Sequence, residues 1–169
     1  NSSFLTTGNF IDVAQFSAAL GAVVVAESLV LLVGELDLSL QSVYGLAPMV
    51  AAWLIVPKAE VGLGSDLPAA LGIVILLAVG FGIGLFNGVM IVKGRFNSFI
   101  FTLAMLILLA GIQQGIVSGN TIYAMPAAFV YLGAAAWLGV PVAAWVSGLI
   151  FLGAGLFLRY HRTGRAIYA

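Results

Sequence analysis

Long stretches without a single charged residue are the feature that most constrains this chain. Three of them cover residues 38–57, 67–92 and 96–158. Only 7% of the 169 residues are charged and 63% are hydrophobic, whereas a soluble domain carries about 25% charged residues. A bilayer core takes about 20 consecutive apolar residues for each spanning helix. We therefore predict an all-α, polytopic transmembrane helical bundle.

Polar and turn-forming segments divide the chain into about five predicted spanning helices, all within a single transmembrane domain over residues 1–169. These helices are expected at 11–34, 38–56, 67–92, 98–117 and 140–158. Residues 127–139 are apolar but too few to span, so we expect a short interfacial or re-entrant helix there.

Basic residues predict the orientation of these helices. Lys93 and Arg95 follow the third predicted helix, and Arg159, Arg162 and Arg165 follow the fifth. Two spans separate the two groups, so both lie on one side, which the positive-inside rule makes cytoplasmic. The loop 57–66 and the segment 118–139 are then external, as is the start of the chain. An external start without a preceding span leads us to expect that a first helix is missing.

The stretch GELDLSL at residues 34–40 predicts a helix break at 34–37. Gly34 suits the end of the first helix. Asp37 can accept N–H groups of the next helix's first turn, with assistance from Ser39, and its charge suits that helix end. Breaks at membrane depth are tolerated only inside protein or beside a water-filled cavity. We therefore assign Gly34, Glu35 and Asp37 to the helix break, a feature at which transporters build their sites.

A second acidic group, Glu27, lies well inside the first predicted helix. A charge at the bilayer centre costs on the order of 3 kcal/mol, so Glu27 is protonated, paired, or beside a polar cavity. A structural and a functional role both remain open. On a helical wheel Glu27 points away from a face of small residues, against which we expect another helix to pack: Ala18, Ala22, Val25 and Ala26.

Glycines recur at helical spacing in the third and fourth predicted helices. Gly80, Gly84 and Gly88 lie on one face of the third, and Gly111 and Gly115 repeat the spacing in the fourth. In membranes such rows let helix backbones approach closely. We predict that these five glycines are helix-packing positions.

Neutral polar side chains in the fourth helix suggest a second kind of pathway group. Gln113 and Gln114 carry amide donors and acceptors that suit an uncharged, polyhydroxylated solute. Hydrogen bonding between helices is the alternative interpretation of the same residues.

Several kinds of chemistry are missing from the sequence. It has no cysteine, one histidine and zero net charge. Metalloprotease, nucleophile-elbow and Walker A motifs do not occur. We therefore expect no catalytic residues, no cofactor, no metal site and no nucleic-acid partner, and any ATP hydrolysis would need a separate subunit.

Four motifs, in order, resemble a known family. They are GELDLS at 34–39, GLFNGV at 84–89, SFIFTLAML at 98–106 and HRTGRAIYA at 161–169. This order is similar to that in the permeases of bacterial ribose- and xylose-type sugar importers of the ATP-binding-cassette superfamily. The chain departs from the family pattern at Leu36, Leu40, Gln41 and Ser98. It also stops where the second half of such a permease would follow, so we expect it to be part of a longer protein.

The resemblance implies a multi-pass permease in the bacterial inner membrane that imports a small polar solute, expected to be a monosaccharide, by alternating access. Its implied partners are a second permease copy, a cytoplasmic ATPase and a periplasmic sugar-binding protein, besides the lipid bilayer. It places Arg162 and Arg165 on the cytoplasmic face near the ATPase. We expect five residues to shape or line the solute pathway: Glu27, Asp37, Ser39, Asn87 and Gln113.

A proton-coupled secondary transporter is the alternative. Broken helices and an intramembrane carboxylate fit it equally well, with Glu27 as the proton carrier.

Overall fold

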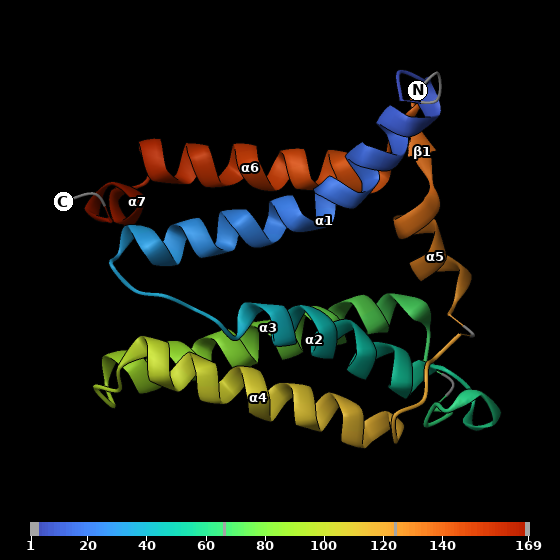
Figure 1. The fold of residues 1–169 in the computed structure, drawn as a ribbon, viewed down its shortest axis with the longest axis horizontal. Coiled ribbons are helices and arrows are strands. Elements are labelled where there is room, and N and C mark those ends of the chain that lie inside the picture. The colour runs from blue at the N-terminus through green and yellow to red at the C-terminus, as the bar shows by residue number, and fades with distance from the viewer. Residues whose placement is uncertain (1–3, 66, 124, 168–169) are drawn as a thin grey trace. The chain divides into compact units, whose positions relative to one another are not determined.

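The chain is helical almost throughout in a computed structural model, which describes residues 4–65, 67–123 and 125–167. Figure 1 shows the order of the elements. They are α1 (Thr7–Leu32), α2 (Leu40–Ile55), the 3₁₀ turn η1 (Lys58–Glu60), α3 (Ala69–Val92), α4 (Ser98–Val117), α5 (Ala127–Ala134), β1 (Ala136–Trp137), β2 (Val140–Pro141), α6 (Val142–Tyr160) and α7 (Arg162–Ala166).

Four helices in the described part of the chain are long and apolar enough to cross a membrane, namely α1, α3, α4 and α6. The remaining predicted span, the second in chain order, corresponds to α2, an apolar helix of 16 residues with Pro48 inside it. It is shorter than the expected 38–56 because residues 38 and 39 belong to a turn that precedes the helix. The predicted all-α, polytopic architecture is confirmed.

The segment 127–139 differs from the single short helix expected there. Helix α5 ends at Ala134, and a two-stranded antiparallel hairpin pairs Trp137 with Val140. Leu138 and Gly139 form its turn with φ of 55° and 78°, the combination that two-residue hairpins require. A leucine at the first of these positions gives no sequence signal for such a turn, and the strands are only two residues long.

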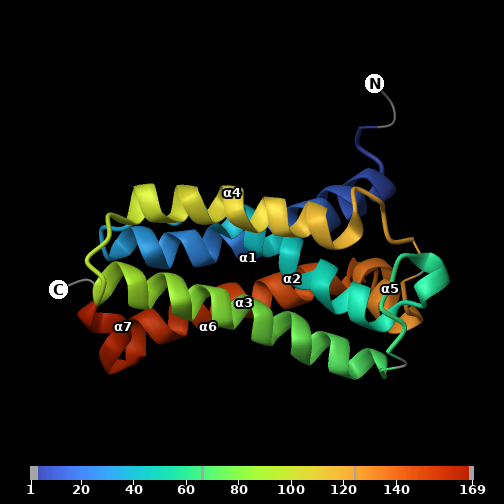
Figure 2. The same cartoon turned by 90° about the horizontal axis from the view of Figure 1, so that it is seen from below.

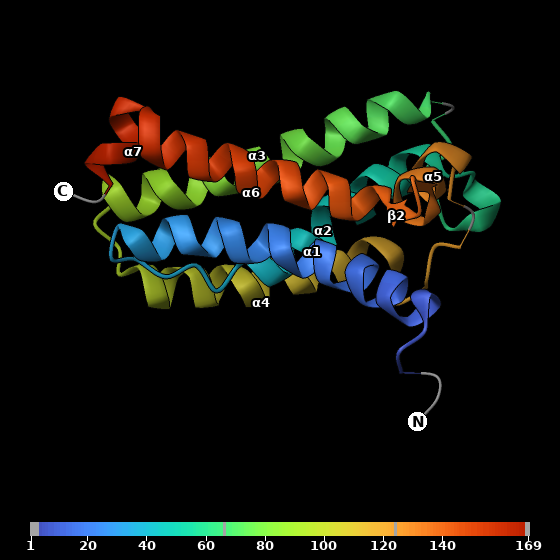
Figure 3. The same cartoon turned by 90° about the horizontal axis from the view of Figure 1, so that it is seen from above.

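The helices form two compact units, one of residues up to Glu35 together with those from Val130 onward, and one of residues 36–129. In the first unit, α1 and α6 lie side by side and run in the same direction (Figure 3). The predicted small-residue face of α1 makes this contact, with Ala18 and Val25 buried. A Cβ atom at Gly21 would lie 2.7 Å from the Ser147 hydroxyl oxygen on α6, so the absence of a side chain permits this close approach.

The second unit is built around α2, which contacts both α3 and α4 and lies between them in Figure 2. Its core joins Leu46 of α2 to Met105 and Leu109 of α4. The hydroxyl of Ser42 donates to the carbonyl oxygen of Leu106 at 2.8 Å, which ties the same two helices together. Burial on both flanks explains why α2 can carry polar groups and a proline at membrane depth.

Candidate functional site

The helix break begins with a complete C-terminal cap on α1. Gly34 has a φ of 81°, a conformation that glycine adopts without strain. Its N–H donates to the carbonyl oxygen of Leu31 at 2.9 Å, and the N–H of Glu35 donates to that of Val30 at 3.2 Å. These two bonds form a Schellman motif. Gly34 therefore ends the first helix as predicted.

Asp37 prepares the start of α2. One of its carboxylate oxygens, Oδ1, accepts the N–H of Ser39 at 2.9 Å and the Ser39 hydroxyl at 2.6 Å. The side chain thus satisfies an N–H that has no partner within the helix. The sequence predicts that Asp37 accepts N–H groups of the first turn of α2, whereas Oδ1 bonds Ser39 in the turn before the helix, and Ser39 occupies the cap position.

Ser39 links this break to α3. Its side chain is fully buried, and its hydroxyl oxygen accepts a hydrogen bond from the amide nitrogen Nδ2 of Asn87 at 2.8 Å. Because the single hydroxyl hydrogen is donated to Asp37, the nitrogen of Asn87 must face Ser39. Asn87 is only 3% exposed, and its oxygen Oδ1 has no hydrogen-bond partner among the described residues.

Thr102 holds the extended segment from the side of α4. Its fully buried hydroxyl accepts the N–H of Leu38 at 3.1 Å. The same hydroxyl is also a donor. Its oxygen lies 2.7 Å from the carbonyl oxygen of Ser98 and 3.3 Å from that of Leu36. One side chain thus satisfies backbone groups that the break removes from helical pairing. Segment 36–39 is therefore clamped between α3 and α4.

Within the unit of residues 36–129, the structure brings together three of the four predicted pathway residues that this unit contains. Asp37, Ser39 and Asn87 form one hydrogen-bonded chain. Glu27 lies half-buried on α1, in the other compact unit. Gln113 is on α4 eleven residues beyond Thr102, which corresponds to about 16 Å along a helix.

Gln113 lines a separate cavity of about 360 Å³ between α2 and the end of α4. Pro48 and Met49 contribute from α2, and Asn120 and Thr121 from the segment after α4. A smaller cavity of about 140 Å³ is lined by Gln113, Gln114 and Asn120. The two glutamines predicted as solute-binding groups therefore lie at hollows of the protein.

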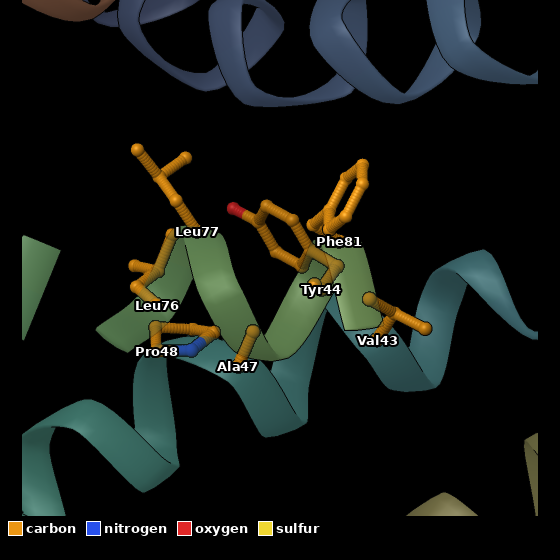
Figure 4. Close-up of a pocket in the computed structure, with 8 residues that line it drawn as sticks. Val43, Tyr44, Ala47, Pro48, Leu76, Leu77 and Phe81 are labelled. Carbon is orange, nitrogen blue, oxygen red and sulfur yellow. The ribbon is translucent and has the colours of Figure 1, made fainter. Parts of the chain in front are cut away.

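A larger cavity, about 640 Å³, lies between α2 and α3 (Figure 4). Its walls are apolar apart from Tyr44, and Figure 4 shows the ring of Tyr44 lying between Leu77 and Phe81. Such a lining suits hydrocarbon rather than a hydroxylated solute. Pro48 lines both this cavity and the one at Gln113.

Among the described residues, only one of the five glycines predicted to pack against another helix has a close neighbour. A Cβ at Gly80 would meet Val43 at 4.0 Å, whereas at the other four positions it would meet nothing within 4 Å: Gly84, Gly88, Gly111 and Gly115. Helix packing at these four positions remains a prediction. Close approaches between long helices of this chain occur instead at glycines such as Gly21, Gly45 and Gly72.

Arg162 and Arg165 both lie exposed on α7. His161 starts this short helix by accepting the N–H of Thr163 at 3.3 Å. Gly164 is buried, and a Cβ there would collide with the carbonyl oxygen of Phe157. The glycine of the HRTGR motif is therefore what lets α7 fold back against the end of α6 while its arginines stay in solvent.

Sequence reasoning missed two residues that organise these sites. Gly45 was not singled out, yet its missing side chain makes room for Gln113; only knowing that α2 faces α4 could have revealed this. Ser42 also bridges these two helices. The described residues include no group of three His, Asp or Glu side chains that could hold a metal ion.

Sequence comparison identifies relatives for nearly the whole chain. The ribose import permease protein RbsC of Escherichia coli K12 is 34% identical over 99% of this chain and 51% of its own length. The L-arabinose ABC transporter permease protein AraH of Azospirillum brasilense is 31% identical over 98% of this chain and 47% of its own. The D-allose transport system permease protein AlsC of E. coli K12 is 31% identical, with coverages of 98% and 49%.

No family model matches the chain, and no solved structure matches it. The chain spans about half the length of the curated relatives it matches. The matches confirm the resemblance carried by the four motifs and agree with the predicted multi-pass location in the inner membrane. The chain is thus homologous, over nearly all of its own length, to about half of a sugar import permease of the ribose, arabinose and allose type.

Proposed function

We propose that the chain is part of the membrane permease of an ATP-driven importer that carries a small polar solute, a monosaccharide, by alternating access. The observation that carries this proposal is the 34% identity over 99% of the chain with a permease named for ribose import. The chain itself would be a transport subunit rather than an enzyme.

The partners follow from this role. A second permease copy would complete the pathway, a cytoplasmic ABC ATPase would supply the energy, and a periplasmic binding protein would deliver the sugar. The exposed Arg162 and Arg165 on α7 are well placed for a protein contact because neither is used in the internal packing of that helix. The positive-inside rule supports a cytoplasmic position for them, on the side of the ATPase.

The helix break supports a role at the pathway. The half-buried Asp37 and the buried Ser39 and Asn87 form a polar chain in an apolar helical unit, and irregular backbone at membrane depth is tolerated only within protein or beside water. Asn87 lies five residues before the end of α3, near Lys93 and Arg95, so this chain would sit in the cytoplasmic half of the pathway.

Co-purification tests the proposed assembly. The full-length permease, isolated from its own membrane in mild detergent, should retain a subunit that hydrolyses ATP. Arg162→Ala combined with Arg165→Ala should lower the recovery of that subunit, whereas the control Arg95→Ala should not. Recovery of a permease without any ATPase from membranes that contain both would contradict the proposal.

A further inference from the structure

The cavity at Gln113 has the features of a small-molecule site that the helix break does not explain. Its volume of about 360 Å³ falls within the range of about 300–1,000 Å³ typical of ligand pockets. It lies wholly in the unit of residues 36–129. Part of its lining comes from the C-terminal end of α4. Lys93 and Arg95 lie just before the N-terminal end of this helix, so the positive-inside rule makes the C-terminal end external.

Gln113 presents an unused amide to this cavity. The side chain is half-buried and has no hydrogen bond to another described residue. A primary amide offers two donors and an acceptor with two lone pairs. Leaving such a group unbonded in an apolar helical unit is costly unless water or a ligand satisfies it.

Gly45 gives this amide its place. A Cβ atom at position 45 would lie only 2.7 Å from Oε1 of Gln113. The amide therefore lies flat against the backbone of α2, where any other residue would displace it. Gly45 itself belongs to the lining.

The remaining lining indicates the class of ligand. Asn120 and Thr121 add polar groups beside Gln113, and the amide nitrogen of Asn120 is partly engaged by the carbonyl oxygen of Val117 at 3.1 Å. No lining residue that the structure describes is charged. Met49 and Met125 supply adaptable apolar surface. Neutral hydrogen-bonding groups beside apolar surface complement a sugar ring, which carries hydroxyl groups at its rim and C–H groups on its faces.

We propose that this cavity is an external-side binding site for one uncharged monosaccharide, held chiefly by the amide of Gln113, which Gly45 positions. This inference rests on the proposed function and adds to it a place where the permease itself contacts the sugar. Gln113 then contributes hydrogen bonds to solute hydroxyl groups, while Asn120 and Thr121 border the mouth of the site. The larger cavity between α2 and α3 does not compete for this role, since its lining is apolar apart from Tyr44.

Protection from a thiol reagent tests the site. The chain has no cysteine, so Thr121→Cys can be introduced into the full-length permease, with any cysteine elsewhere in the protein replaced, and labelled in vesicles by a membrane-impermeant maleimide. D-Ribose, L-arabinose, D-xylose and D-allose serve as probes. At least one should slow the labelling of Thr121→Cys, and the anionic analogue D-ribonate should not. Ser65→Cys, in the loop after α2, is the unprotected control.

A second variant distinguishes binding from a general change of shape. Adding Gln113→Ala to Thr121→Cys should raise the half-protecting sugar concentration about tenfold, as expected for one or two lost hydrogen bonds. Gln41→Ala, an exposed glutamine on α2 outside the cavity, should leave it unchanged. Gly45→Ala should act like Gln113→Ala, because its methyl group displaces the amide, whereas Gly82→Ala, which meets nothing within 4 Å, should have no effect.

Three results overturn the site: protection by none of the four sugars, equal protection of Ser65→Cys, or equal effects of Gln113→Ala and Gln41→Ala. Uptake by the same vesicles separates this failure from failure of the proposed function. ATP-driven uptake without protection would reject the site and leave the importer intact. Protection without ATP-driven uptake would support the site and reject the importer.

Discussion

The amide nitrogen of Asn87 on α3 donates a hydrogen bond of 2.8 Å to the hydroxyl oxygen of Ser39 at the start of α2. Both side chains are buried, at 3% and 0% exposure. Since the same hydroxyl donates to Asp37 at 2.6 Å, α3 is joined through Ser39 to the carboxylate at the helix break. Asp37, Ser39 and Asn87 therefore stabilise one another through hydrogen bonds.

This relationship predicts energetic coupling between Asn87 and Ser39. Asn87→Ala and Ser39→Ala should each destabilise the full-length permease, because each leaves the other buried polar group without its partner. The free energy of unfolding should fall less in the double variant than the two single losses add up to, and the difference, the coupling energy, should be about 1 kcal/mol. Unfolding in mixed micelles of SDS and detergent gives the free energies of unfolding of the wild type, the two single variants and the double variant. These four values form a double-mutant cycle. Strictly additive effects would show that the contact contributes nothing.

Thr102→Val should loosen the extended segment 36–38 while leaving α4 intact. Valine keeps the shape of threonine but cannot accept the N–H of Leu38, which lies 3.1 Å from the threonine hydroxyl. An unsatisfied buried group of this kind costs about 1–3 kcal/mol. Hydrogen exchange at the amide of Leu38 should become faster. The exposed control Thr7→Val, at the start of α1, should not change it, and unchanged exchange in Thr102→Val would rule out the clamp.

Gly164→Ala and Gly153→Ala should change stability in opposite directions. At Gly164 a methyl group meets the carbonyl oxygen of Phe157, and such overpacking costs about 1–3 kcal/mol. At Gly153 on α6 it meets nothing within 4 Å, so the higher helix propensity of alanine should add about 0.5–1 kcal/mol. Thermal unfolding of the two full-length variants measures the difference. An equal response would mean that α7 does not fold back on α6 as described.

The local signals of the helix break could be predicted from the sequence. Gly34 and Asp37 each carry their structural role in their own chemistry, as a left-handed cap and as an acceptor for N–H groups. The bond between Ser39 and Asn87 could not be predicted, because it depends on α3 packing against α2. Sequence periodicity gives the faces of a helix but not which helix lies against which face.

The glycines illustrate the same limit. The row of Gly80, Gly84 and Gly88 has the stronger sequence pattern, yet close approaches between long helices are made at isolated glycines such as Gly45 and Gly21. A single glycine becomes informative only when its neighbour is known, here Gln113 or Ser147. The hairpin after α5 was likewise unpredictable from its short apolar strands.

Glu27→Gln should retain transport, with a reduction of tenfold or less, because glutamine keeps the size and the hydrogen-bonding capacity of the side chain. Tenfold corresponds to about 1.4 kcal/mol. The measurement is accumulation and downhill exchange of a radiolabelled sugar. Cells that express the wild-type permease are compared with cells that express an equal amount of the Glu27→Gln variant. Loss of accumulation with intact exchange would instead identify Glu27 as the carrier of a coupled proton, since glutamine cannot release one.

The dependence of uptake on ATP tests the proposed importer most directly. The full-length permease is reconstituted in vesicles with its ATPase and binding protein, and accumulation of D-ribose, L-arabinose, D-xylose and D-allose is followed with ATP supplied on the ATPase side. We predict that at least one sugar accumulates, that an uncoupler leaves this unchanged, and that a Walker A lysine substitution in the ATPase abolishes it. Accumulation that is driven by a proton gradient and persists with the inactive ATPase would contradict the proposed function.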